Sequence, residues 1–137
     1  MEHCNKALVR TFPNVELGFT LEVPALAEEL DELFTMTKVD FMAIGTSDLF
    51  SLFNGICRNN QRLSVSPTSN ANIRLLRRVV TCARKNGVHT FVCGDIRRNE
   101  TIMTELLQAG VSELICSAQV KELSSTFNLS SSRLFLV

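Results

Sequence analysis

Polar and reactive side chains stand at the end of each of four short apolar runs in this sequence. Glu22 follows the first run, Asp48 lies just beyond the second, Cys93 ends the third and Ser117 follows the fourth. If these runs are parallel strands, their carboxyl ends meet at one edge of a sheet, and parallel α/β proteins bind ligands at that edge. The spacing therefore predicts one site assembled from residues that are far apart in the chain.

Three of these side chains suit defined chemistry, and each also has a structural interpretation. Glu22 and Asp48 can together hold a hard divalent cation such as Mg²⁺, whose octahedral shell takes carboxylates, substrate oxygens and waters. Alternatively, each carboxylate caps the helix that follows it. Cys93 can serve as an acid or a nucleophile if its pKa is tuned, or it can be a small buried apolar residue.

A turn after the second run can receive an anion. Gly45 is followed by Thr46 and Ser47, and backbone N–H groups at the start of a helix bind phosphate well. Glycine is common in turns of this kind, so the signal is weak by itself. Arg97 and Arg98, which follow the third run, can also meet an anion at the same edge.

The elements that must position these residues alternate along the chain. Apolar runs predict strands, and amphipathic segments predict helices. The strands are expected at 15–22, 39–44, 88–93 and 113–116, and the helices at 25–36, 46–53, 71–86, 100–109 and 118–123, with a long loop at 54–70. Four successive βα units with parallel strands indicate an α/β fold with helices covering the sheet. A full (β/α)8 TIM barrel needs about 250 residues, so four units equal half a barrel, although composition alone does not separate this from a small open sheet.

Charge and composition restrict the partners. Lys plus Arg and Asp plus Glu number 14 each, so no net field favours nucleic acid or an anionic membrane. A local basic face is expected on the helix at 71–86, where a solvated surface is the plain interpretation; it consists of Arg74, Arg77, Arg78, Arg84 and Lys85. The five cysteines include no CxxC pair, which is typical of reduced thiols in a cytosolic protein. The sequence has no apolar run of 18 residues, so we expect a cytoplasmic protein without a membrane span.

Several segments together resemble a known family. LEVPAL at 21–26, VDFMAIGTSDLFSLF at 39–53, CRNNQRLS at 57–64 and FVCGD at 91–95 are similar to enzyme I of the phosphotransferase system, a phosphoenolpyruvate (PEP)–protein phosphotransferase. More distantly they resemble pyruvate phosphate dikinase. EELDEL and DLF lean towards the nitrogen-related branch. The resemblance divides the chain into the remainder of a helix at 1–14, the second half of a PEP-binding barrel at 15–123 and a tail at 124–137.

The resemblance implies Mg²⁺-dependent transfer of the phosphoryl group of PEP to a histidine on another domain. It assigns the metal to Glu22 and Asp48, a phosphate contact to Arg58, and protonation of the enolpyruvate carbon to Cys93. The GTSD segment, which contains Gly45, Thr46 and Ser47, would contact the substrate. An arginine and a metal ion would offset phosphoryl charge, and a thiol would supply the proton.

The sequence also departs from the family pattern. Ser47 stands where the family has asparagine, Cys57 replaces an acidic residue, and Arg97 and Arg98 replace small residues. The first half of the barrel and the phosphohistidine domain have no counterpart in the sequence. We therefore expect a fragment that is inactive alone and is completed by a complementary N-terminal half or by homodimerisation. The alternatives are a non-catalytic regulatory or binding module on the same scaffold, and a remnant without a selected function.

Overall fold

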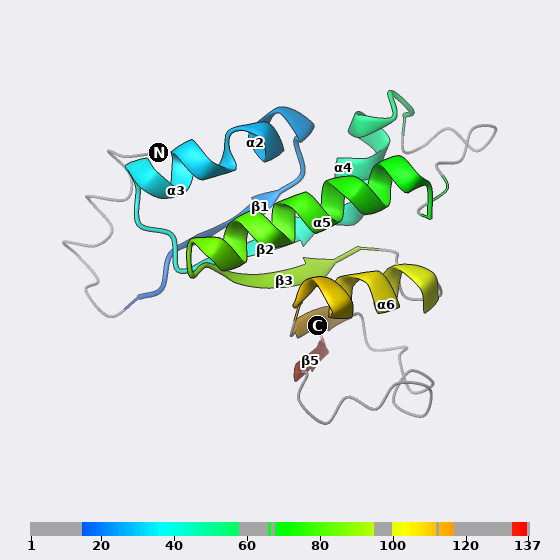
Figure 1. Cartoon of the computed structure of the whole chain (residues 1–137). Helices are drawn as coiled ribbons and strands as arrows, with labels where there is room; N and C mark the ends of the chain where they lie inside the picture. Colours follow the sequence, from blue (N-terminus) through cyan, green and yellow to red (C-terminus); the bar gives the residue numbers. More distant parts are fainter. Residues whose placement is uncertain are drawn as a thin grey trace.

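The protein alternates strands and helices in a computed structural model that describes residues 15–57, 66, 68–94, 100–111, 113–116 and 133–136 (Figure 1). The strands are β1 (Gly18–Leu21), β2 (Phe41–Gly45), β3 (His89–Cys93), β4 (Glu113–Cys116) and β5 (Arg133–Leu136). The helices are α2 (Pro24–Glu28), α3 (Leu30–Met36), α4 (Thr46–Phe53), α5 (Asn70–Lys85) and α6 (Glu100–Ala109). No helix in these ranges is long and apolar enough to cross a membrane.

The strands form one parallel sheet in sequential order, β1-β2-β3-β4-β5. The prediction of an α/β fold with parallel strands is therefore confirmed. Each of the first three strands is followed by helix, whereas the helix predicted at 118–123 lies outside the described residues. The last strand, β5, falls within the segment that we interpreted as a tail.

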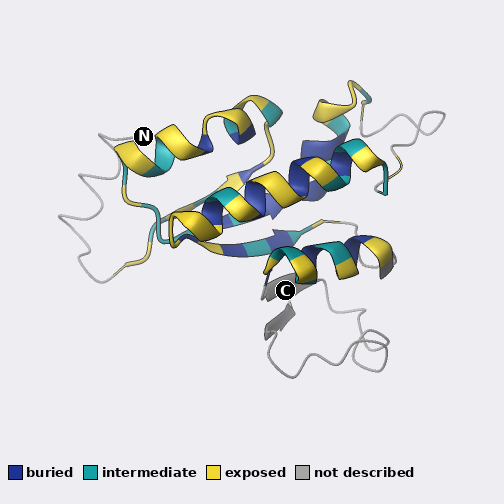
Figure 2. Cartoon of the chain, in the orientation of Figure 1, coloured by how far each residue is buried: buried dark blue, intermediate teal, exposed yellow. Residues whose placement is uncertain are grey.

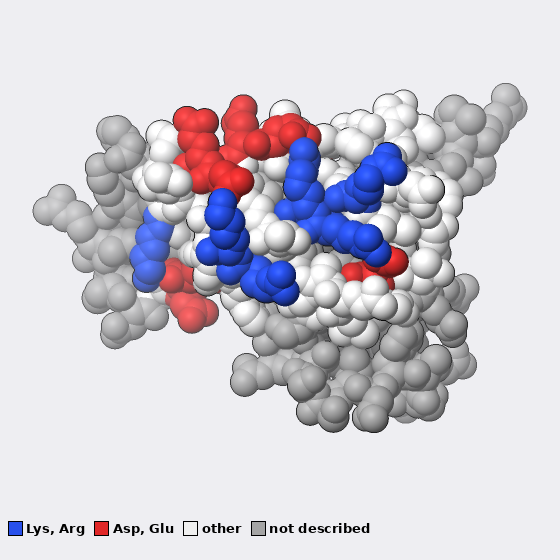
Figure 3. Space-filling model, in the orientation of Figure 1, with Lys and Arg blue, Asp and Glu red and all other residues white. Residues whose placement is uncertain are grey.

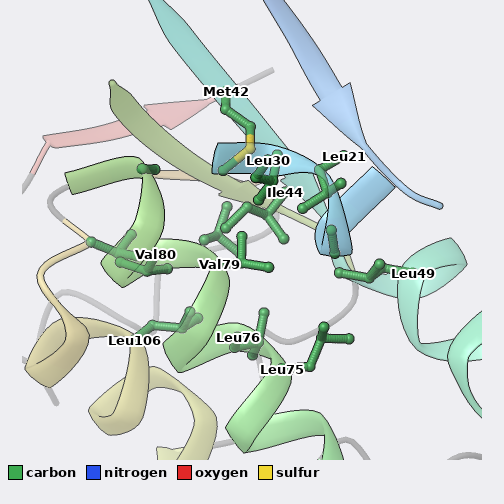
Figure 4. Close-up of a cluster of buried hydrophobic side chains, with 14 of the residues drawn as sticks. Leu21, Leu30, Met42, Ile44, Leu49, Leu75, Leu76, Val79, Val80 and Leu106 are labelled. Atoms are coloured by element: carbon green, nitrogen blue, oxygen red, sulfur yellow. The ribbon is translucent and has the colours of Figure 1, made fainter. Parts of the chain in front are cut away.

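The helices share one face of the sheet. Figure 1 shows α3, α5 and α6 on the same side, and a single apolar core joins Leu30 of α3, Val79 of α5 and Leu106 of α6 to Ile44 of β2. Figure 4 shows these side chains converging between the helices and the strands. Sequential strand order explains the arrangement, because right-handed crossovers between successive neighbours all place their helices on the same side.

The other face of the sheet carries no helix among the described segments. Met42 and Ile44 of β2 are buried against the helices, whereas Phe41 and Ala43, which alternate with them along the strand, remain partly exposed. Phe41 contacts Phe91 of β3 in an edge-to-face arrangement with 5.7 Å between ring centroids. Helices therefore cover the sheet, as expected, but in the described part of the chain they bury one face only.

The central helix α5 follows from its sequence. Apolar residues recur at helical spacing and are buried, among them Leu76, Val79 and Val80, while the opposite face is exposed (Figure 2). Burying side chains of this size stabilises the fold by about 1.5–3 kcal/mol each. The hydroxyl of Ser69 caps the helix by accepting from the backbone N–H of Asn72 at 3.2 Å.

The segment predicted as one helix over 25–36 is two helices. At Glu29 the backbone leaves helical geometry, with φ −98° and ψ 7°, and its N–H bonds to the carbonyl of Leu26. This i→i−3 bond is the tight turn that commonly ends an α-helix. Helical periodicity continues across the break, so the pattern alone did not reveal it.

Candidate functional site

Three predicted site residues meet at the carboxyl edge of the sheet. The register pairs Leu21 with Ile44, and Gly45 with Cys93. Glu22 is the residue after Leu21, so it emerges beside Gly45 at the ends of neighbouring strands. Residues more than 70 positions apart in the chain, Glu22 and Cys93, are thereby separated in the sheet only by β2.

Gly45 has no side chain, and the side chain of Glu22 occupies the space that one would fill. A Cβ atom at this position would lie 2.6 Å from both Cγ and Oε1 of Glu22, so the carboxylate lies across the end of β2 where no side chain stands. The φ of Gly45 is −82°, a value open to most residues. The Glu22 side chain, and not the backbone conformation, is therefore what a larger residue at position 45 would displace.

Cys93 is a protonated thiol next to this carboxylate. Its Sγ lies 3.5 Å from the carbonyl oxygen of Ile44, to which it donates. Burial raises the pKa of Cys93 above its ordinary value of 9.0, and the negative charge of Glu22 raises it further. Both effects disfavour the thiolate, so at neutral pH the thiol can donate a proton and is poorly suited to act as a nucleophile.

The start of α4 is fastened to the end of β3. Thr46 is buried, and its hydroxyl donates to the carbonyl oxygen of Cys93 at 2.9 Å. Ser47 lies against Gly94, where a Cβ would be 3.0 Å from the serine Oγ and 3.2 Å from its backbone nitrogen. Gly94 has φ +114°, a conformation that L side chains rarely adopt. The first N–H groups of α4 are thus held at the same edge as Glu22, Gly45 and Cys93.

The two predicted metal ligands have different surroundings. Glu22 is exposed and makes no hydrogen bond or ion pair with another described residue. It does not cap α2, because Val23 is the N-cap and Pro24, which lacks an N–H, begins the helix. Asp48 is partly buried in the first turn of α4, where a negative charge also favours the helix dipole. Asp48 is not the N-cap of α4 either, since Gly45 is, so its structural interpretation is this charge in the first turn.

The described part of the chain contains no group of three or more His, Cys, Asp or Glu side chains arranged to hold a metal. Within the described residues, an ion at this edge would have the two carboxylates of Glu22 and Asp48 as candidate ligands. That number suits Mg²⁺, which keeps several waters and completes its shell with substrate phosphate. It does not suit a cage built entirely from protein ligands.

Arg58, the predicted phosphate contact, lies outside the described residues, and Asn72 links the described residues Asn54 and Ser66. Asn54 donates to the side-chain oxygen of Asn72 at 2.9 Å, and the Asn72 amide donates to the carbonyl of Ser66 at 2.9 Å. Asn72 is completely buried. Sequence analysis did not select this residue, although an asparagine among the apolar positions of a helix is an available signal, since buried amides must be hydrogen-bonded.

Comparisons with known proteins show the family of this chain. The family described as "PEP-utilising enzyme, PEP-binding domain" matches residues 1–125, and the chain belongs to that family. The match begins at residue 1, so it includes the segment that we had interpreted as the remainder of a helix.

Individual relatives carry the name phosphoenolpyruvate-protein phosphotransferase. The protein of Staphylococcus aureus is 35% identical over 107 residues, covering 77% of this chain and 18% of the relative. That of Listeria monocytogenes is 34% identical with the same coverage, and that of Buchnera aphidicola is 31% identical over 126 residues, covering 88% and 22%. The chain thus spans about a fifth of the length of these relatives.

Proposed function

We propose that this chain is the second half of a PEP-binding (β/α)8 barrel and contributes to PEP-dependent phosphoryl transfer in a phosphotransferase system. The nitrogen-related branch is favoured by EELDEL at 28–33 and DLF at 48–50. The observation that carries the proposal is the convergence of Glu22, Gly45 and Cys93 at one sheet edge in a chain of the PEP-binding family. The chain is not expected to be active alone.

The arrangement of the sheet supports half a barrel over a small open sheet. Open doubly wound sheets place helices on both faces, whereas a barrel places them only outside. Here the strands are in sequential order and the described helices share one face. Parallel sheets bury both faces in nearly all known folds, so the face with Phe41 and Phe91 needs a cover. In this proposal a complementary N-terminal half or a second copy supplies it.

Mg²⁺ would be held by Glu22 and Asp48. The fit rests on donor chemistry: two carboxylates leave room for waters and phosphate oxygens, and the Glu22 carboxylate is exposed without a hydrogen-bond or ion-pair partner among the described residues. When bound, the ion would offset the charge on the phosphoryl group during transfer.

The substrate would be oriented by backbone groups and one arginine. The N–H groups of Thr46 and Ser47, after Gly45, would donate hydrogen bonds to a phosphate at the N-terminus of α4. Arg58 would pair with the same phosphate in the forked geometry that suits guanidinium groups. In this proposal these contacts would position PEP with its enol carbon facing the end of β3.

Cys93 would complete the reaction as the acid. The bond between phosphorus and the enol oxygen of PEP breaks, and the phosphoryl group passes to a histidine nitrogen on another domain. The electron pair left on the enolate is protonated at carbon by the Cys93 thiol, which gives pyruvate. The thiolate then regains a proton from water. A thiol whose pKa is raised is protonated and ready for this step at neutral pH.

Calorimetric titration with PEP, with and without Mg²⁺, tests the proposal. The chain should bind PEP weakly or not at all alone, and should bind it in the presence of Mg²⁺ when mixed with the N-terminal half of a family barrel. Glu22→Gln should abolish the dependence on Mg²⁺, while Asp40→Asn, at the opposite edge, should leave binding unchanged. Absence of binding in every mixture would contradict the proposal and favour a non-catalytic module, which the changes at Ser47 and Arg97–Arg98 would then explain.

A further inference from the structure

The outer surface of the helical layer carries a groove that is separate from the candidate PEP site. The groove has a volume of about 210 Å³ and lies between α2, α4 and α5. Its lining residues are Glu28, Phe53, Ala71, Arg74, Leu75 and Arg78. This volume is below the roughly 300–1,000 Å³ range of small-ligand sites, and it suits one or two side chains.

The apolar part of the groove is unusually open to solvent. Phe53 is 39% exposed and the adjacent Leu52 is 58% exposed, whereas Leu75 on the groove floor is 4% exposed. Exposed aromatic side chains beside a cation are typical of the central residues of protein–protein interfaces. The end of α4 therefore resembles an interface more than an ordinary solvated helix.

The charges around the groove leave one cation available. Arg78 forms a bidentate pair with Glu28, with Nη1 donating to Oε2 at 2.6 Å, and this hydrogen bond lowers the pKa of Glu28. Arg74 has no ion-pair partner within the described ranges. Two arginines and one glutamate line the groove, so the lining has a net charge of +1.

We propose that this groove docks a segment of a partner protein in which an apolar side chain stands next to an acidic one. The apolar side chain would pack between Phe53 and Leu75, and the carboxylate would pair with Arg74. A nucleic acid fits less well, because acidic side chains of α2 and α3 lie beside the arginines of α5 on the same surface (Figure 3) and would repel a continuous polyanion. The surface thus selects a short acidic segment and not an extended chain of phosphates.

Titration of the full 137-residue chain with two capped dipeptides, followed by backbone amide NMR, tests the proposal. N-acetyl-Leu-Glu-amide should shift the amide signals of Phe53, Ala71 and Leu75 in a saturable manner, whereas N-acetyl-Leu-Lys-amide should not. Arg74→Ala should weaken the binding roughly three- to five-fold, the range expected for one exposed ion pair. Arg84→Ala is the matched control, since Arg84 is also exposed on α5 without an ion-pair partner among the described residues, and it should leave the affinity unchanged.

Three outcomes would overturn the proposal. They are the absence of saturable shifts around the groove, equal binding of the two dipeptides, and equal affinity in Arg74→Ala and the unsubstituted chain. Phe53→Ala provides a second variant, in which loss of binding to the glutamate dipeptide is expected and full retention would count against the apolar half of the proposal. Both substituted side chains are exposed, and circular dichroism should show an unchanged helical signal.

Discussion

The carboxylates at the two edges of the sheet differ in whether they have hydrogen-bond and ion-pair partners among the described residues. At the amino edge, Asp40 accepts from the backbone N–H of Leu17 at 2.9 Å and pairs with Lys38 at 3.0 Å. The backbone of Asp40 also joins β1 to β3, since it donates to the Leu17 carbonyl and accepts from His89. At the carboxyl edge, Glu22 lies over Gly45 without such partners among the described residues.

The difference separates a stabilising role from a binding role. A carboxylate whose oxygens are already engaged contributes to the fold and has little left to offer a ligand. A carboxylate that faces solvent contributes little to stability and keeps its oxygens for an incoming ion or substrate. In parallel α/β folds the carboxyl edge is the one that binds, and the distribution of partners here follows that rule.

Replacing a glycine at each edge should reveal the largest difference between the two edges. A Cβ at Gly18 would overlap the ring and the carbonyl oxygen of Phe41, which as backbone cannot move aside, whereas at Gly45 it would meet the flexible end of Glu22. We expect Gly18→Ala to lower the free energy of unfolding by about 3 kcal/mol, and Gly45→Ala by less than about 1 kcal/mol because Glu22 can swing away. Urea denaturation measures both. Equal losses would show that the edges do not differ in rigidity.

Removing the charge of Asp40 at the amino edge should lower the free energy of unfolding by less than Gly18→Ala does. Asp40→Asn should lower the free energy of unfolding by about 1 kcal/mol at neutral pH, because a charged acceptor becomes a neutral one. The hydrogen bond from Leu17, and then Lys38, hold the pKa of Asp40 below its usual 3.8. Its contribution is therefore present above pH 3.8 and is lost as the pH falls through the lower pKa of the folded state.

Denaturation curves at several acidic pH values would test this dependence. The difference in unfolding free energy between Asp40→Asn and the unsubstituted chain should narrow as the pH falls below the pKa of the unfolded aspartate. Glu32→Gln is a suitable control, since Glu32 is exposed on α3 and its removal should leave the curve unchanged. A difference that stays constant down to the most acidic pH would contradict a role for the Asp40 charge.

Cys93 should show the opposite pH dependence and a smaller effect. Burial and Glu22 raise its pKa above 9.0 in the folded state, so folding favours the neutral thiol. Stability from this source is complete below the unfolded pKa and is lost as the pH rises towards the folded pKa. Thermal denaturation should therefore show a steeper alkaline decline for the unsubstituted chain than for Cys93→Ser. The exposed Cys57 provides a control in Cys57→Ser, which should keep the steeper decline.

Glu22→Gln should have the smallest effect on stability, within about 0.5 kcal/mol, as for most exposed positions. Its effect should instead appear at Cys93, whose pKa should fall because the neighbouring negative charge raises it. The pH dependence of alkylation, in a chain whose other cysteines are serine, would measure this change. An unchanged Cys93 pKa would show that Glu22 does not act on the thiol.

Much of the architecture could be predicted from periodicity and turn residues. The strand ending at Cys93, the helix over 46–53 and the helix over 100–109 have their predicted positions, because apolar spacing and glycine turns are local signals. The break at Glu29 could not be predicted, since the apolar spacing continues through it. The strand β5 was also missed, because it is defined by its pairing with β4, and pairing between distant strands leaves no local pattern in a serine-rich tail.

The candidate site divides along the same line. Residue types and their order along the chain determined that carboxylates, a thiol and a glycine turn would stand at strand ends, because each follows an apolar run. Only the tertiary structure decided that Glu22 lies over Gly45, that Thr46 donates to the carbonyl of Cys93 and that Asn72 links Asn54 to Ser66. Those contacts depend on strand register and helix packing, which bring distant residues together and are set by the whole core. The sequence pattern can place a residue at the edge of the sheet, but strand register and helix packing determine which residue it contacts there.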